Sequence, residues 1–69
     1  MAQYIIELTV YDFRGSRVTN LFFVNGTECA WDTYRELRDR FPGSASIELI
    51  YCETGEIVAY EDHEADESF

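Results

Sequence analysis

One stretch of this 69-residue chain has a helical period, and strand-like segments lie in pairs on either side of it. Its apolar positions follow the i, i+4, i+7, i+11 spacing of an amphipathic helix, and they are Ala30, Tyr34, Leu37 and Phe41. We expect this helix to span residues 28–41, because Pro42-Gly43 ends it. Asn25 or Thr27 is expected to cap its first turn. One helix between two pairs of strands restricts the chain to a small α+β fold.

Four segments are rich in the β-branched and aromatic residues that strands prefer. They are residues 4–11, 18–24, 46–53 and 56–60. Gly15 and Gly55 lie between the members of each pair, where a tight hairpin turn needs a positive φ. The sequence therefore predicts the order ββαββ, with a four-stranded, mostly antiparallel sheet and one helix packed on one face. We expect one compact domain over residues 1–60, and the pattern leaves the strand order open.

One helix can cover only one face of this sheet. In the first strand, the period of two assigns Tyr4, Ile6, Leu8 and Val10 to the helix side. The other face is expected to carry Ile5, Glu7, Thr9 and Tyr11 from the first strand, Glu48, Ile50 and Cys52 from the third, and Val58 and Tyr60 from the fourth, with Ile57 and Ala59 opposite. Segment 18–24 is apolar on both sides, so its faces stay unassigned. A mixed aromatic, aliphatic and acidic surface is typical of protein interfaces, although ordinary half-exposed sheets also carry one.

Charge restricts the kind of partner. Fourteen acidic residues stand against five Arg and no Lys, which gives a formal net charge of -9. Such a chain repels nucleic acid and anionic membranes and favours basic proteins, although solubility alone also explains many acidic surfaces. Residues 61–69 carry five acids and no basic residue, and we expect them to form a disordered tail. The N-terminus lacks the basic start of a signal peptide, which favours the cytoplasm, or a host's cytoplasm if a phage encodes the chain.

No catalytic or metal-binding pattern stands out. The only histidine is His63, inside the acidic segment, where no nucleophile accompanies it. Cys29 and Cys52 lie too far apart for a zinc spacing, and we interpret them as reduced thiols. We therefore expect no enzymatic activity, no cofactor and no metal.

The first functional hypothesis is an inhibitor that docks on a basic, nucleic-acid-binding protein or nuclease complex and imitates nucleic acid. Its expected binding residues are Glu48, Glu53, Glu56, Glu61, Asp62, Glu64, Tyr11, Ile50 and Tyr60, with Asp32, Glu36 and Asp39 as further candidates on the helix. Arg35, Arg38 and Arg40 dilute the negative field of the helix, which favours the second hairpin and the tail. Small acidic phage proteins that block host nucleases, including anti-CRISPR and anti-restriction proteins, are similar in size and character.

The alternative is a small structural or regulatory subunit that forms a homodimer through the open face of its sheet. In that case Tyr11, Phe23, Ile50 and Tyr60 matter more than the carboxylates. An enzyme ranks last, because a chain this short can hardly enclose a pocket.

Overall fold

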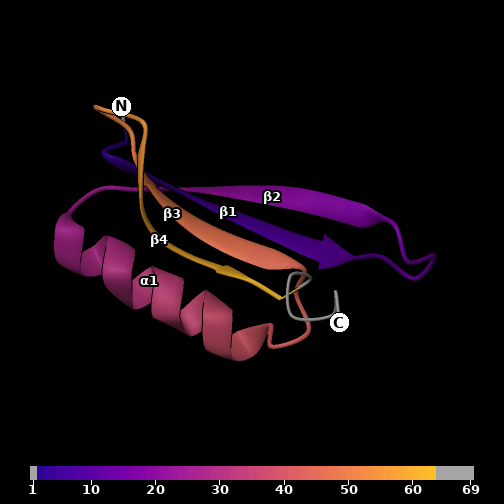
Figure 1. Ribbon diagram of the computed structural model, residues 1–69. Coiled ribbons are helices and arrows are strands. Elements are labelled where there is room, and N and C mark those ends of the chain that lie inside the picture. Colours follow the sequence, from indigo (N-terminus) through magenta and orange to yellow (C-terminus); the bar gives the residue numbers. More distant parts are fainter. Residues whose placement is uncertain (1, 64–69) are drawn as a thin grey trace.

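The computed structural model describes residues 2–63 and has the predicted order ββαββ (Figure 1). Its elements are β1 (Tyr4–Tyr11), β2 (Arg17–Val24), α1 (Thr27–Arg40), β3 (Ser46–Tyr51) and β4 (Glu56–Asp62). The four strands form one sheet in the order β2-β1-β3-β4, and all neighbouring strands are antiparallel. The predicted α+β class, the four-stranded antiparallel sheet and the single helix on one face are confirmed.

The hydrophobic core lies between α1 and one face of the sheet. The helix contributes the buried side chains of Ala30, Tyr34 and Leu37 from its predicted stripe, and the two central strands contribute Tyr4, Ile6, Leu8, Ile47 and Leu49. Phe41, the last member of the stripe, is 38% exposed, since the helix ends at Arg40 and Phe41 is its C-cap. The core is small, because α1 packs mainly against β1 and β3 and leaves β2 at one side.

The two hairpins form as the glycine positions indicate. Gly15 and Gly55 both have positive φ, at 81° and 77°. In the first turn, the Asp12 carboxylate accepts hydrogen bonds from the backbone N–H groups of Arg14 (2.8 Å) and Ser16 (2.9 Å). This side-chain contact fixes the turn and so sets the register, in which β1 and β2 pair over eight residues without a bulge.

The prediction that Asn25 or Thr27 caps the helix is wrong. Gly26 is the N-cap, with φ of 91°, and no side chain caps the first turn. Asn25 and Gln3 instead tie the two chain segments together, since the Gln3 N–H donates to Asn25 Oδ1 (3.0 Å) and the Gly26 N–H donates to Gln3 Oε1 (2.8 Å). The Thr27 hydroxyl is hydrogen-bonded to the Tyr4 hydroxyl at 3.1 Å, so it takes part in a contact at the edge of the core and does not cap the helix.

Strand β4 differs from the prediction in two ways. It continues to Asp62, because Glu61 pairs with Ile47 and Asp62 pairs with Ser46, so these two residues belong to the sheet. A register shift near Ile50 also places Ile57 opposite Ile50, while Ala59 lies opposite Leu49. The prediction that Ile57 shares the helix-facing side with Ala59 is therefore wrong: the bulge interrupts the period of two. Residues 64–69 of the predicted tail lie outside the described residues.

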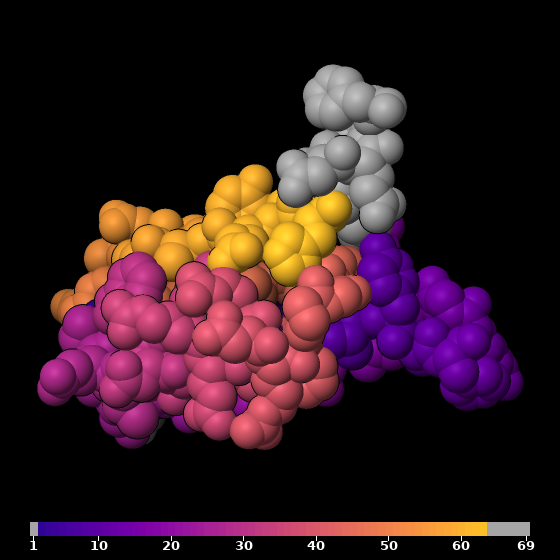
Figure 2. Space-filling view, turned by 90° about the horizontal axis from the view of Figure 1, so that it is seen from below, coloured from indigo at the N-terminus to yellow at the C-terminus, as the bar shows by residue number. Residues whose placement is uncertain are grey.

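The helix covers one side of the sheet only. Figure 2 shows α1 and β4 side by side on that side, with the β1–β2 hairpin projecting beyond the end of the helix. Figure 1 shows the opposite side of the sheet without a helix. Within residues 2–63, no helix has the length and apolar character that crossing a bilayer requires.

Candidate protein-binding face

The side of the sheet that no described element covers is called here the open face. Its members follow from the strand registers, because directly opposed residues in antiparallel strands project to the same side. They are Arg17, Thr19, Leu21 and Phe23 of β2, Ile5, Glu7, Thr9 and Tyr11 of β1, Ser46, Glu48 and Ile50 of β3, and Ile57, Tyr60 and Asp62 of β4. The predicted members Cys52 and Val58 lie at its margin, Cys52 just after β3 and Val58 at the bulge.

An apolar row crosses the open face near the N-terminal end of β1. The registers place Phe23, Ile5, Ile50 and Ile57 side by side on four successive strands. Phe23 is 66% exposed and Ile57 is 51% exposed, so both ends of the row are open to solvent. Leu21 and Tyr60, also exposed, flank the next row. Contiguous exposed apolar side chains of this kind are unusual in a monomer and mark interaction surfaces.

Two carboxylates lie in the middle of this apolar surface. Glu7 of β1 and Glu48 of β3 are directly opposed and interact through their side chains. Both are half-buried, with Leu21 and Tyr60 as their outer neighbours in the same row. Among residues 2–63, no Arg or His lies within ion-pair distance of either carboxylate. Two opposed like charges destabilise a strand pair, so the fold holds this pair at a cost.

The surroundings of Glu48 change the titration of its carboxyl group. Burial, the hydrogen bond with Glu7 and the negative charges of Glu7 and Asp62 together raise the pKa of the Glu48 carboxyl above its ordinary value. A raised pKa means that the charged form is disfavoured in the folded protein. A cation placed between the two carboxylates would stabilise the charged form.

Replacing Glu48 with Gln is expected to stabilise the protein at neutral pH by about 0.5–1 kcal/mol. Because the pKa of Glu48 is raised on folding, the folded protein holds the proton more tightly than the unfolded chain does. The cost of the charged pair is therefore absent below the ordinary pKa, about 4.3, and appears as the pH rises through the raised pKa. Urea unfolding of the variant and the parent at about pH 4 and pH 7 measures the difference in their free energy of unfolding. The variant should be more stable than the parent only at the higher pH.

Glu56→Gln, at the β3–β4 turn, is the matched control for this measurement, since it makes the same chemical change on an exposed side chain. It is expected to change the free energy of unfolding little at either pH. A Glu48→Gln protein that is less stable than the parent at pH 7, or equally stabilised at both pH values, contradicts the assigned repulsion.

The predicted binding residues do not all share one surface. Glu48, Ile50, Tyr60 and Tyr11 lie on the open face, and Asp62 lies there too, opposite Ser46. Glu53 and Glu56 lie at the turn between β3 and β4, where the Tyr51 hydroxyl donates a hydrogen bond to Glu53 (2.6 Å). Glu61 lies on the helix side, 3.6 Å from Arg38. Glu64 lies outside the described residues.

The carboxylates of the helix already have cationic neighbours. Asp32 contacts Arg35 (3.4 Å), Asp39 contacts Arg38 (3.4 Å) and Glu36 contacts Arg40 (2.9 Å). These exposed pairs contribute little to stability, but each balances the charge of a candidate carboxylate. The open face is thus the part of the described surface where carboxylates combine with exposed apolar side chains.

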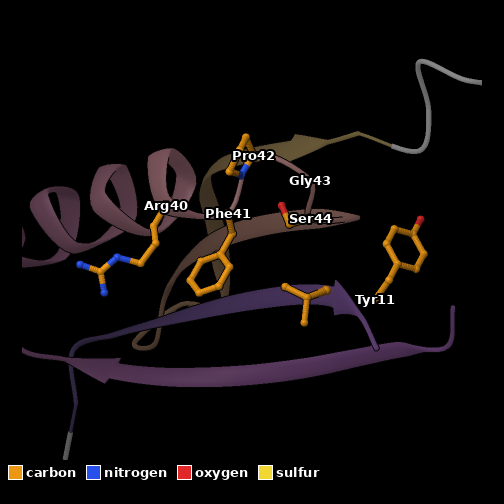
Figure 3. A pocket seen from close by; sticks show the side chains of 7 residues that line it. Tyr11, Arg40, Phe41, Pro42, Gly43 and Ser44 are labelled. Carbon is orange, nitrogen blue, oxygen red and sulfur yellow. The ribbon is translucent and has the colours of Figure 1, made fainter. Parts of the chain in front are cut away.

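A shallow cavity of about 300 Å³ lies between the end of β1 and the loop after α1 (Figure 3). It is lined by Val10, Tyr11, Arg40, Phe41, Pro42, Gly43 and Ser44. Figure 3 shows the Phe41 ring directed toward β1 and the Arg40 side chain directed away from the other labelled residues. Among the described residues, the buried Ser44 hydroxyl has no hydrogen-bond partner, and no carboxylate lines the cavity. The cavity therefore brings together no acid–base pair.

No group of three His, Cys, Asp or Glu side chains is placed to hold a metal ion within residues 2–63. His63 contacts the Ser44 carbonyl oxygen through Nδ1 (2.8 Å) and Glu61 through Nε2 (3.4 Å), so it connects β4 to the loop before β3. Cys29 is exposed on the helix, and Cys52 is half-buried after β3. The predictions of no enzymatic activity and no cofactor stay predictions.

Comparison with known proteins gives no relative: no family model matches the chain, and no curated protein or solved structure is significantly similar to it.

Sequence reasoning missed three features of the open face. Leu21 belongs to it because the turn at Asp12 sets the hairpin register, a signal that the sequence carries. Ile57 belongs to it because of the bulge in β4, which no residue pattern announces. The pairing of Glu7 with Glu48 depends on the β1–β3 register, which joins residues far apart in the chain.

Proposed function

We propose that this chain is a small acidic inhibitor that binds a basic, nucleic-acid-binding protein or nuclease complex through the open face. The observation that supports the proposal is the Glu7–Glu48 pair, which lies between exposed apolar side chains and has no basic neighbour among the described residues. The anti-CRISPR or anti-restriction kind of activity is part of the same proposal. It rests on size and charge, since the chain has a net charge of -9.

The chemistry of the pair selects a cation. A guanidinium group presents several N–H donors in one plane and can donate to two carboxylates at once, which makes Arg the best-fitting partner side chain. Its positive charge offsets the repulsion between the opposed carboxylates of Glu7 and Glu48. The apolar row then packs against the aliphatic or aromatic neighbours of that Arg.

Inhibition follows from what such an Arg does in its own protein. Proteins that bind nucleic acid use Arg and Lys to contact phosphates, and the binding free energy depends on those contacts. A carboxylate pair that occupies one of these side chains removes it from phosphate. The remaining negative charge of the chain adds long-range attraction to the same basic surface and speeds association.

The second candidate is a homodimer that buries the open face against itself. The exposed apolar row favours this dimer, because contact between the two open faces would bury the side chains of Phe23 and Ile57. The charged pair disfavours it, because a face-to-face dimer places two Glu7–Glu48 pairs in one interface. We therefore rank the hetero-partner first.

The proposal predicts a salt-sensitive basic partner. The tagged full chain is used to capture proteins from a lysate of the cells in which it acts, at about 50 mM and about 500 mM salt. We expect a nucleic-acid-binding protein with a basic surface to be retained at low salt and released at high salt or by added nucleic acid. The proposal is contradicted if the captured proteins do not bind nucleic acid and are released neither by high salt nor by added nucleic acid.

A further inference from the structure

The two edges of the sheet differ in how they are protected. The outer edge of β4 carries Glu56, Glu61 and Asp62 and is distorted by the bulge near Ile50. Charged residues and bulges are the usual means by which a sheet edge is kept from pairing with another chain. The outer edge of β2 is less protected: the strand is regular over eight residues, its only charged residue is Arg17 at its first position, and most of its side chains are exposed.

The backbone of β2 offers a regular set of hydrogen-bonding groups on this edge. The Asp12 N–H donates to the Ser16 carbonyl (2.9 Å), and every second pair along the hairpin is bonded in the same way. The even-numbered residues of β2 therefore bond to β1. The N–H and C=O groups of Thr19, Leu21 and Phe23 point to the outside, where no described strand lies.

The charge distribution indicates what pairs with this edge. Residues 13–27 contain two Arg and no Asp or Glu, although the whole chain has a net charge of -9. Two copies of the chain repel each other over most of their surfaces, and this stretch is where they approach without meeting carboxylates. The strand is also self-complementary, since in antiparallel register about Leu21 the Leu21 residues meet each other and Thr19 meets Phe23.

We propose that β2 pairs with β2 of a second copy, antiparallel and centred on Leu21, to give a continuous eight-stranded sheet. The inference is independent of the proposed function. The helices do not obstruct the pairing, because α1 packs mainly against β1 and β3 and the β1–β2 hairpin projects beyond it (Figures 1 and 2). The two open faces then join on one side. Their Glu7 residues lie three strand spacings apart, about 14 Å, which is farther than a Debye length in physiological salt.

The test compares Thr19→Pro with Thr19→Val by sedimentation equilibrium. Both variants lose the hydroxyl contact between Thr19 and Thr9 (3.0 Å), but only proline loses the outward N–H, and edge strands tolerate proline. We expect the parent and Thr19→Val to reach the mass of two 8.1 kDa chains between about 10 µM and about 1 mM. Thr19→Pro is expected to weaken the dimer at least about 10-fold, since two symmetric hydrogen bonds are lost.

Amide hydrogen exchange of the parent protein provides a second measurement that needs no variant. The N–H groups of Thr19, Leu21 and Phe23 are expected to become slower to exchange as the protein concentration rises, while those of Asn20 and Phe22 are protected throughout. A parent chain that stays monomeric to about 1 mM overturns the proposal. A dimer that Thr19→Pro leaves intact overturns it as well. So does slower amide exchange in β2 that is seen only when a different protein is added.

Discussion

Replacing Ile6 with alanine is expected to leave a large fraction of the protein unfolded at room temperature. Ile6 is fully buried at the centre of the core, between α1 and the sheet. Removing a buried isoleucine side chain down to alanine costs about 2–5 kcal/mol, because the apolar contacts are lost and a cavity remains. A single small core of this size supplies only about 3–5 kcal/mol of net stability. The substitution therefore removes most of the free energy of unfolding.

Ile57→Ala is the matched control, since the residue type and the change are identical and Ile57 is 51% exposed on the open face. It is expected to cost less than about 1 kcal/mol. Urea unfolding followed by circular dichroism, at low protein concentration, compares the two. Equal losses at Ile6 and Ile57 would show that the helix covers a different face from the one assigned here.

The second large effect is expected on binding. Replacing both Glu7 and Glu48 with Gln should lower the affinity for the captured basic partner at least about 30-fold. Truncating one side of a desolvated charge pair costs about 2–5 kcal/mol of binding free energy. The double variant should itself be at least as stable as the parent, since the like-charge pair disfavours the fold. A loss of affinity in this variant therefore cannot be attributed to unfolding.

Asp32→Asn combined with Glu36→Gln is the control for net charge. This control also removes two negative charges, but it removes them from the helix, where each carboxylate already contacts an Arg. We expect the partner affinity to change less than about 3-fold at moderate salt, by a weaker long-range attraction alone. Equal losses in the two double variants would mean that total charge, and not the open face, determines binding.

Local sequence signals predicted the elements of the fold well. Alternation in β1 assigned Ile6 and Leu8 to the core, and the helical stripe identified Tyr34 and Leu37 as its counterparts. Gly15 and Gly55 marked both turns. Each of these signals acts over a few residues, so one strand or one turn contains all the information that the prediction needs.

The composition of the open face depended on pairing that no local signal specifies. The β1–β3 register brings Glu7 to Glu48 across a separation that includes β2 and the helix. The bulge in β4 moved Ile57 to the open face, and the tertiary contact of Asn25 with Gln3 replaced the expected helix cap. Sequence reasoning thus assigned Glu7 and Glu48 to the open face but did not predict that the two carboxylates lie opposite each other.

The central claim is that the partner binds the open face, and the five isoleucine residues of the chain test it in one experiment. Ile5, Ile50 and Ile57 form the apolar row, whereas Ile6 and Ile47 are fully buried on the helix side. Methyl-labelled isoleucine is observed by NMR while the captured basic partner is titrated into the protein. We predict that the methyl signals of the three row residues shift or broaden while those of Ile6 and Ile47 change little. Binding that leaves the three row signals unchanged would contradict the claim.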